Sequence, residues 1–322
     1  PYNIMNAVNG EQYPHIDNDL LNFETNDMGY CLRFMKYNGC IIRYSLSSNN
    51  WLLFNGKVWR VDTDNEVMRR AIDMVQIYIN TANALPKENP DKNNYIAHAY
   101  GSMKSISKML KLLKKYVYIS GDALDKHPHL ITVKNGMINM ATGQLLPFDS
   151  NLFLTQYVDI NYTPYYNAPV FFKFLNRIFS GNIDVIRYIQ KIVGYSLTGQ
   201  TDQQCFFIFY GNGNNGKSTF ANIFARLFKQ YVKTIPTRIL LDGNAGQGST
   251  SSELAAAFNT RLLMASETNE DGCLNESKIK HLSGEDEISV RALYCNSFEY
   301  FPKFKIWFNT NYVPNVKGVE TY

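Results

Sequence analysis

The spacing of apolar and polar residues divides the chain into segments of different character. Residues 25–161 alternate short apolar stretches with Asn-Gly turns and two-faced helical stretches, which predicts a small α+β domain. Residues 201–322 contain three unbroken apolar runs, at 205–210, 261–267 and 304–311, which have the length of buried parallel strands. The sequence therefore predicts an α/β domain with a central parallel sheet, preceded by the smaller α+β domain.

Two further segments flank or connect these domains. Residues 1–24 are polar and weakly patterned, which is typical of a linker or of a strap that lies on a neighbouring domain. Residues 162–200 open with a stretch rich in proline and tyrosine and then show helical spacing at 170–180 and 183–197, so we expect a helical linker. Because the chain begins at Pro1, we also expect it to be part of a longer protein.

Aromatic residues gather on one predicted hairpin of the first domain. The Asn55-Gly56 turn joins two apolar stretches, which is the strongest short hairpin pattern, and Trp51, Phe54 and Trp59 flank it. These rings could stack on nucleic-acid bases, but three aromatic residues on a small hairpin more often belong to a core. We therefore favour the core interpretation.

The helix expected at 102–117 has two distinct faces. One face is apolar, and the other is a basic stripe of four lysines: Lys104, Lys108, Lys111 and Lys115. A stripe of this kind can contact phosphates, although a solvated helix face is the commoner explanation. The sequence alone leaves both interpretations open.

The strongest chemical signal is the segment 210–219, which reads Tyr-Gly-Asn-Gly-Asn-Asn-Gly-Lys-Ser-Thr. It matches the phosphate-loop pattern G-x-x-x-x-G-K-[ST], in which backbone N–H groups surround the phosphates of a nucleotide. The predicted nucleotide contacts are consecutive residues: Gly211, Asn212, Gly213, Asn214, Asn215, Gly216, Lys217, Ser218 and Thr219. An apolar strand precedes the loop and helical spacing at 220–228 follows it, which a phosphate loop requires and an ordinary Gly/Asn turn does not.

The residue types of this loop each suit one task. Glycine allows the main chain to turn through positive φ and to approach an oxyanion closely. The Lys217 ammonium can reach the β- and γ-phosphates, and the Ser218 hydroxyl can ligate Mg²⁺. We therefore expect a nucleotide and Mg²⁺ at this loop.

Two other strand ends supply candidate catalytic groups. The second apolar run delivers the carboxylate of Glu267 at its C-terminal end, where parallel sheets form their ligand crevices. We expect this carboxylate to hold Mg²⁺ or to polarise the attacking water. The third run ends in amides, of which Asn311 is the first candidate and Asn309 the second for orienting the hydrolytic water beside the γ-phosphate.

Taken in order, these motifs resemble the superfamily three helicases, of the primase-helicase type found in poxviruses, other large DNA viruses, phages and plasmids. The phosphate loop and the strands that end at Glu267 and Asn311 are similar to three of that family's motifs. Residues 280–291, with Gly284 and Asp286, are similar to an additional one. The resemblance covers nearly the whole chain after the polar N-terminal segment.

The resemblance implies an ATP-dependent replicative DNA helicase with an AAA+-like core. In such an enzyme, water attacks the γ-phosphate of ATP in line, while Lys217 and the loop amides neutralise charge. Ser218 and Glu267 position Mg²⁺ and the water, and Asn311 senses the γ-phosphate. The resemblance further implies a homo-hexameric ring that translocates on single-stranded DNA, and a primase domain upstream in the same polypeptide.

The same resemblance places the DNA strand in the central channel of the ring, against a hairpin that projects between the second and third strands. The residues that it implies for this contact are Lys280, Arg291 and Tyr294. Relatives often carry a lysine where this hairpin has Cys295, which leaves Arg291 as the main phosphate contact. Ser266 precedes Glu267 where many phosphate-loop ATPases have a second acid, so the choice between metal and water for Glu267 stays open.

The composition limits the kinds of partner and the cellular location that are expected for this protein. The chain has 322 residues, of which 45% are hydrophobic, which is enough for two domain cores. Its net charge is only +4, with 32 basic and 28 acidic residues, so any nucleic-acid site must be a local patch. The five cysteines lack C-x-x-C spacing, which indicates reduced thiols in an intracellular protein. The resemblance to viral helicases implies the host cytoplasm or a viral replication site as its location. No apolar run approaches the roughly 20 residues that span a bilayer, so no membrane contact is expected.

Two other functions use the same kind of loop. A small-molecule or nucleoside kinase would need an arginine-bearing lid, for which the insert after Glu267 offers only Arg291. A nucleotide-binding scaffold or loader would bind ATP without turnover. The family resemblance also implies a trans-acting arginine beyond Tyr322, so we expect this chain to bind ATP but to hydrolyse it slowly and to assemble weakly.

Overall fold

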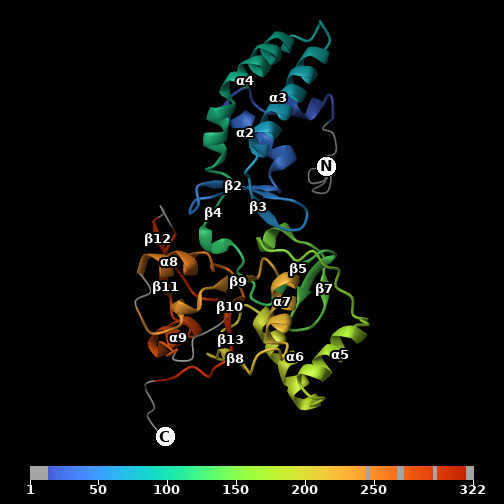
Figure 1. Cartoon of the computed structure of the whole chain (residues 1–322). Coiled ribbons are helices and arrows are strands. Elements are labelled where there is room, and N and C mark those ends of the chain that lie inside the picture. The colour runs from blue at the N-terminus through green and yellow to red at the C-terminus, as the bar shows by residue number, and fades with distance from the viewer. Residues whose placement is uncertain (1–13, 244–246, 267–271, 293–295, 317–322) are drawn as a thin grey trace. The chain divides into compact units, whose positions relative to one another are not determined.

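The computed structural model describes residues 14–243, 247–266, 272–292 and 296–316 (Figure 1). The chain folds as two compact units. Unit 1 comprises Pro1–Lys126 with Phe148–Thr155, and unit 2 comprises His127–Pro147 with Gln156–Tyr322. Each unit has its own core and is described separately.

Unit 1 combines helices with a small sheet. Its helices are α2 (Asp27–Asn38), α3 (Glu66–Ala84) and α4 (Lys92–Leu113), with short 3-10 helices at Asn18–Asn22, Gly121–Ala123 and Ser150–Leu152. Its sheet has the order β3-β2-β1-β4, from β1 (Ile42–Ser45), β2 (Asn50–Phe54), β3 (Trp59–Val61) and β4 (Tyr118–Ile119). β2 and β3 pair antiparallel with Phe54 opposite Trp59, which confirms the predicted hairpin.

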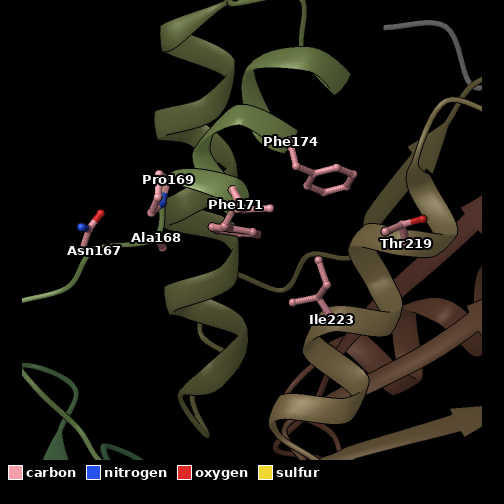
Figure 2. A pocket seen from close by; sticks show the side chains of 8 residues that line it. Asn167, Ala168, Pro169, Phe171, Phe174, Thr219 and Ile223 are labelled. Atoms are coloured by element: carbon pink, nitrogen blue, oxygen red, sulfur yellow. The ribbon is translucent and has the colours of Figure 1, made fainter.

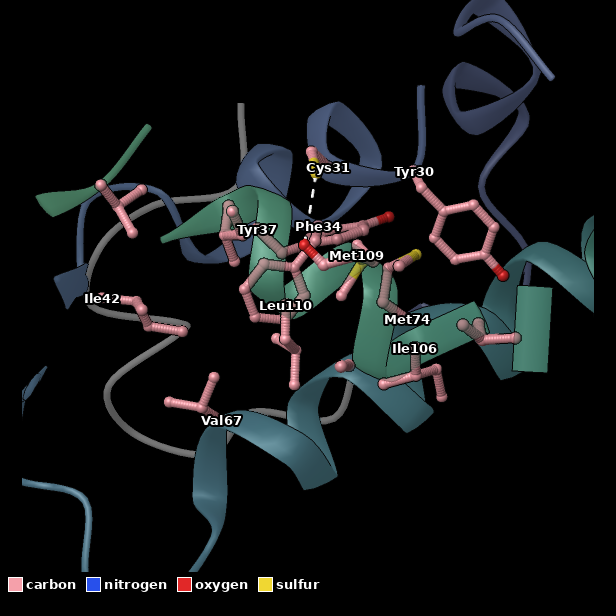
Figure 3. Close-up of a cluster of buried hydrophobic side chains, with 14 of the residues drawn as sticks. Tyr30, Cys31, Phe34, Tyr37, Ile42, Val67, Met74, Ile106, Met109 and Leu110 are labelled. Atoms are coloured by element: carbon pink, nitrogen blue, oxygen red, sulfur yellow. Dashed lines mark hydrogen bonds between the residues drawn. The ribbon is translucent and has the colours of Figure 1, made fainter. Parts of the chain in front are cut away.

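The core of unit 1 lies between its helices and this sheet. Figure 3 shows Cys31 and Phe34 of α2 beside Met74 of α3 and Met109 of α4, and the Cys31 thiol donates to the carbonyl of Met109. Trp59 is also buried, and its indole N–H donates to the Ser150 carbonyl at 2.7 Å. The core interpretation of the hairpin aromatics is thus confirmed for Trp59, because a ring buried in this way cannot stack on a base.

Unit 2 is built around a parallel sheet. The sheet has the order β8-β13-β10-β9, from β8 (Phe207–Tyr210), β9 (Val232–Ile235), β10 (Leu262–Ser266) and β13 (Lys305–Thr310), and all neighbouring strands are parallel. The helices of the unit are α5 (Pro169–Ile178), α6 (Ile183–Leu197), α7 (Lys217–Leu227), α8 (Gln247–Ala255) and α9 (Glu276–Ser283), with a 3-10 helix at Thr237–Ile239. The predicted α/β architecture with a central parallel sheet is confirmed.

Two antiparallel sheets complete unit 2. One is formed by β5 (Leu130–Val133), β6 (Gly136–Asn139) and β7 (Leu145–Leu146), and the other is the hairpin of β11 (Ile288–Arg291) and β12 (Ser297–Tyr300). The sequence predicted this second hairpin as two strand-like halves around a polar centre.

Successive side chains along each strand point to opposite faces of the central sheet. On one face, Trp307 of β13 packs against Phe220 and Phe224 of α7, with ring centroids 5.8 and 5.5 Å apart, and α5 and α6 join the same cluster. On the other face, Ile306 and Phe308 pack in a cluster with residues of α8, α9 and the β11–β12 hairpin. The sheet is therefore covered on both faces, which explains its continuous apolar strands.

The division into units differs from the predicted domain limits. The segment 162–200 is not a free linker, because Leu175 of α5 and Ile192 of α6 are buried in the core cluster of the sheet. The β5–β7 sheet, which the sequence assigned to the first domain, belongs to unit 2. There the hydroxyl of Tyr231 accepts from the backbone N–H of Thr132, a contact 99 positions apart in sequence that no local pattern reveals.

Candidate nucleotide-binding site

The predicted phosphate loop connects the end of β8 to the start of α7. Gly211 and Gly216 adopt φ of +153° and +90°, and Asn214 lies in the left-handed region at +62°. A Cβ at Gly211 would lie 2.2 Å from Nδ2 of Asn215, and a Cβ at Gly216 would lie 2.7 Å from Cγ2 of Ile178. Glycine is therefore required at both positions by backbone conformation and by space.

Lys217 spans the loop from the first turn of α7. Its ammonium donates to the carbonyls of Gly211 and, at 3.3 Å, Asn212, and to Oδ1 of Asn215 at 3.0 Å. Burial lowers the pKa of Lys217, because the charged form loses hydration there. All of these described partners are neutral, so the charge of this cation is not compensated by any described carboxylate. An anion at the loop would supply that compensation.

The strand order determines how far the other candidate groups lie from this loop. β13 lies between β8 and β10, so the ends of β8 and β10 are two strand spacings apart, or roughly 10 Å. This leaves room for a phosphate and a water beside the loop. The described part of β10 ends at Ser266, and Glu267, the predicted metal ligand or water-activating acid, lies outside the described residues.

The two asparagines at the end of β13 have different environments. Asn311 follows the strand in a bend and is exposed, whereas Asn309 is within the strand and only 6% exposed. Both amide atoms of Asn309 lack a hydrogen-bond partner among the described residues. In register, Asn309 lies opposite Phe209 of β8 and Ser266 of β10, on the face that carries Trp307 two residues earlier. Asn309 is thus an unpaired buried amide at the carboxyl end of the sheet, and such a group usually has a partner.

An apolar cavity of about 570 Å³ adjoins the loop (Figure 2). Phe171 and Phe174 of α5 line one side, and Thr219 and Ile223 of α7 line the other, with Asn167 just before α5. Phe174 also approaches the loop itself, since its ring lies 3.4 Å from the position of a Cβ at Gly216. The cavity therefore lies beside the predicted phosphate site, since Phe174 lines the cavity and approaches the loop, and its volume is in the range of small-molecule pockets.

The residues implied for DNA contact lie on separate elements. Lys280 is on α9 and Arg291 is the last residue of β11, and both side chains are exposed. The backbone N–H of Arg291 donates to the Ser251 hydroxyl at 2.7 Å, which attaches the hairpin to α8. Tyr294 lies outside the described residues, as does Cys295.

Two buried cations at the opposite end of the sheet were missed by the sequence interpretation. The Arg261 guanidinium donates to the carbonyls of Leu197 at 2.8 Å and Leu130 at 2.6 Å. The Lys305 ammonium donates to the carbonyls of Thr198 and, at 2.9 Å, Gln200. Both cations thus bind the carboxyl end of α6, which the helix dipole favours. The sequence did contain a signal for these two cations, because Arg261 and Lys305 are each a charged residue near the start of an apolar run.

Comparison with known families adds to this geometry. Residues 31–180 match a family model described as D5 N terminal like. Residues 209–321 match a second model, described as a family of unknown function, DUF5906. A putative helicase of Acanthamoeba polyphaga mimivirus is 26% identical over 202 residues, which is 61% of this chain and 21% of that protein. A putative helicase of Frog virus 3 is 25% identical over 138 residues, which is 42% of this chain and 14% of that protein.

The D5 N terminal like match and the two viral relatives support a D5-type primase-helicase family of large DNA viruses for this chain. The predicted family is thereby confirmed. The D5-type chain spans less than a quarter of the length of either viral relative. Among its described residues, no helix has the length and apolar character needed to cross a membrane.

Solved structures also resemble the D5-type chain in part. Two apo structures of the NrS-1 C terminal region align with 87% of this chain and 56% of theirs, at 8% and 9% identity and TM-scores of 0.46 and 0.48. A likeness of this size does not by itself establish a shared fold.

Proposed function

We propose that unit 2 binds and hydrolyses ATP, and that the protein uses this reaction as a replicative DNA helicase moving along single-stranded DNA. The observation that carries the proposal is the loop at 211–217, in which Gly211 and Gly216 adopt positive φ and Lys217 has only neutral described partners. Such a loop at a helix start and at the carboxyl end of a parallel sheet is an anion site. The two viral relatives named as putative helicases support the class of enzyme.

The residues of the loop have distinct roles in this proposal. Lys217 exchanges its neutral loop acceptors for oxygens of the β- and γ-phosphates, and the backbone N–H groups of Asn212 to Lys217 surround the remaining phosphate oxygens. Ser218 would hold Mg²⁺, which would supply charge neutralisation for the phosphates, and Glu267 would serve the metal or the attacking water.

The cavity between α5 and α7 suits the base of the same nucleotide. Phe171 and Ile223 offer apolar and aromatic surface, and base stacking on an aromatic ring contributes about 1–3 kcal/mol. The Asn167 amide at one end can both donate to and accept from the edge of a purine. Because Phe174 lines the cavity and its ring approaches the loop at Gly216, base and phosphates would occupy neighbouring parts of one site.

The remaining parts of the function follow from the family. Asn311 is the proposed γ-phosphate sensor, and Asn309 stays the second candidate, now with an unpaired amide in its favour. Lys280, Arg291 and Tyr294 are the proposed contacts to single-stranded DNA. A homo-hexameric ring and a primase domain in the same polypeptide are also part of the proposal.

ATP binding by the 322-residue chain tests the site. Lys217→Ala should weaken ATP and tripolyphosphate binding by at least about tenfold in calorimetry, since a charge-assisted contact contributes roughly 1.5–3 kcal/mol. Phe171→Ala should weaken ATP binding alone, whereas Phe172→Ala, at the exposed neighbouring ring, is the matched control. Normal ATP binding by Lys217→Ala with an unchanged circular dichroism spectrum would refute the site. Binding of ATP without hydrolysis by the full-length protein, with or without single-stranded DNA, would instead favour a nucleotide-binding scaffold.

A further inference from the structure

The lysine stripe of unit 1, Lys104, Lys108, Lys111 and Lys115, is exposed at every position. Lys104, Lys108 and Lys111 lie on α4, and Lys115 follows in the turn after the helix. At 3.6 residues per turn, the three helical lysines fall within an arc of about 60°. The buried residues of α4, such as Ile106, Met109 and Leu113, lie on the opposite side, against the core of unit 1. The stripe is therefore the outward face of the helix.

The charge of this face is not balanced by its own element. From Lys92 to Ser120 the chain contains six lysines and no aspartate or glutamate. A solvated helix usually carries charges of both signs, which pair at i,i+4 spacing. Among the described ion pairs, none involves a residue of the lysine stripe. The stripe thus concentrates positive charge in a protein whose net charge is only +4.

Exposed tyrosines flank the lysine stripe at both ends. Tyr100 lies one helical turn before Lys104 and is 55% exposed, although a residue of this size on a helix is often covered. Tyr116 and Tyr118 follow Lys115 and are 49% and 57% exposed. Aromatic faces beside a row of cations are the arrangement that binds single-stranded nucleic acid, in which bases stack and phosphates pair.

We infer that the lysine stripe with its flanking tyrosines is a binding surface for single-stranded DNA on unit 1. The four lysines extend over about 16 Å along the helix direction, so they can contact successive phosphates of one strand. This surface needs neither ATP nor the hairpin that carries Arg291, and it therefore goes beyond the proposed function of unit 2. It gives the D5-type N-terminal region a role in holding the strand.

Salt dependence of binding tests the inference directly. Each phosphate contact to a single strand contributes about −0.7 to the slope of log K against log salt concentration. Replacing all four lysines of the stripe by alanine should therefore flatten the slope by about 2.8, and Lys108→Ala with Lys111→Ala by about 1.4. Alanine favours helix, so these variants keep α4 intact. The measurement is fluorescence anisotropy of a labelled oligothymidine with the full chain, without nucleotide.

A matched control removes equal charge elsewhere in unit 1. Arg69 on α3 and Lys87 after it are both exposed, so the double variant Arg69→Ala, Lys87→Ala should leave the slope unchanged. Tyr100→Ala with Tyr118→Ala should weaken binding at least about fivefold without changing the slope, because stacking releases no counterions. Because the binding is measured without nucleotide, this test is separate from that of the ATP site.

Two results would overturn the inference. One is a quadruple lysine variant with the slope and affinity of the wild type. The other is binding of the chain to vesicles containing phosphatidylserine that depends on the stripe lysines, without any lysine-dependent binding of single-stranded DNA. This result would make the surface a membrane contact.

Discussion

The buried Lys305 ammonium should make the stability of unit 2 depend on pH. Lys305 is 2% exposed, and burial, together with the nearby charge of Arg261, lowers its pKa from 10.5 to about 7. Below pH 7 the group is charged in the folded and unfolded states alike, and folding bears the full cost of burying the charge. Between pH 7 and 10.5 the folded state is neutral while the unfolded state is still charged, so the unfolded state binds more protons. The free energy of unfolding therefore rises with pH in this window.

The size of this pH dependence follows from the lowering of the Lys305 pKa. Each pH unit within the window changes the free energy of unfolding by at most 1.36 kcal/mol, so the gain from about pH 7 to about pH 9 is roughly 2 kcal/mol. Lys305→Met removes the titration but leaves the carbonyls of Thr198 and Gln200 without this donor, a cost that does not depend on pH. The unfolding free energy of the wild type, minus that of Lys305→Met, should thus increase as pH rises.

Urea-induced unfolding followed by circular dichroism at several pH values measures this difference. Lys229→Met, at an exposed position of unit 2, controls for the loss of one positive charge. A difference that stays constant between about pH 7 and pH 9 would show that the carbonyls at the end of α6 keep the ammonium charged, and the reasoning from burial would be wrong.

Two further predictions concern buried polar groups of the same sheet. Arg261→Lys should destabilise unit 2 by about 2–4 kcal/mol in urea unfolding, because an ammonium cannot reproduce the forked contacts to Leu197 and Leu130; a change below about 0.5 kcal/mol would contradict this. Asn309→Leu should raise the unfolding free energy by about 1–3 kcal/mol, since it removes a buried amide that has no hydrogen-bond partner among the described residues. It should also slow ATP hydrolysis if that amide serves the reaction. Increased stability with unchanged hydrolysis would leave Asn311 as the sensor.

Local patterns predicted much of the fold. The Asn-Gly turns located the hairpins at β2–β3 and β5–β6, and the apolar spacing placed α6 at Ile183–Leu197 as observed. The helix α4 was predicted to start at about residue 102, but it begins at Lys92, because Asn93, Asn94 and Gly101 are poor helix formers whose preference tertiary packing overrides. The strand β9 was missed, since four residues with Lys233 among them give too short a pattern.

Long-range contacts account for what the sequence could not show. The order β8-β13-β10-β9 brings Asn309 next to Ser266, although they are 43 positions apart in the chain, and only this register reveals that the Asn309 amide is buried. The cavity beside the phosphate loop likewise joins α5 and α7, whose apolar residues read in sequence as ordinary core positions. The motif residues of the loop were predictable because they are consecutive.

The rings packed beneath the phosphate loop give this protein a built-in optical probe. Of the three tryptophans, Trp51 and Trp59 belong to unit 1, and Trp307 alone reports on unit 2. Its indole is fully buried, donates to the Ser196 hydroxyl at 2.8 Å and lies against Phe220, on the helix that begins at Lys217. A nucleotide that displaces this helix would change the emission of Trp307, so ligand occupancy can be followed by intrinsic fluorescence without a label.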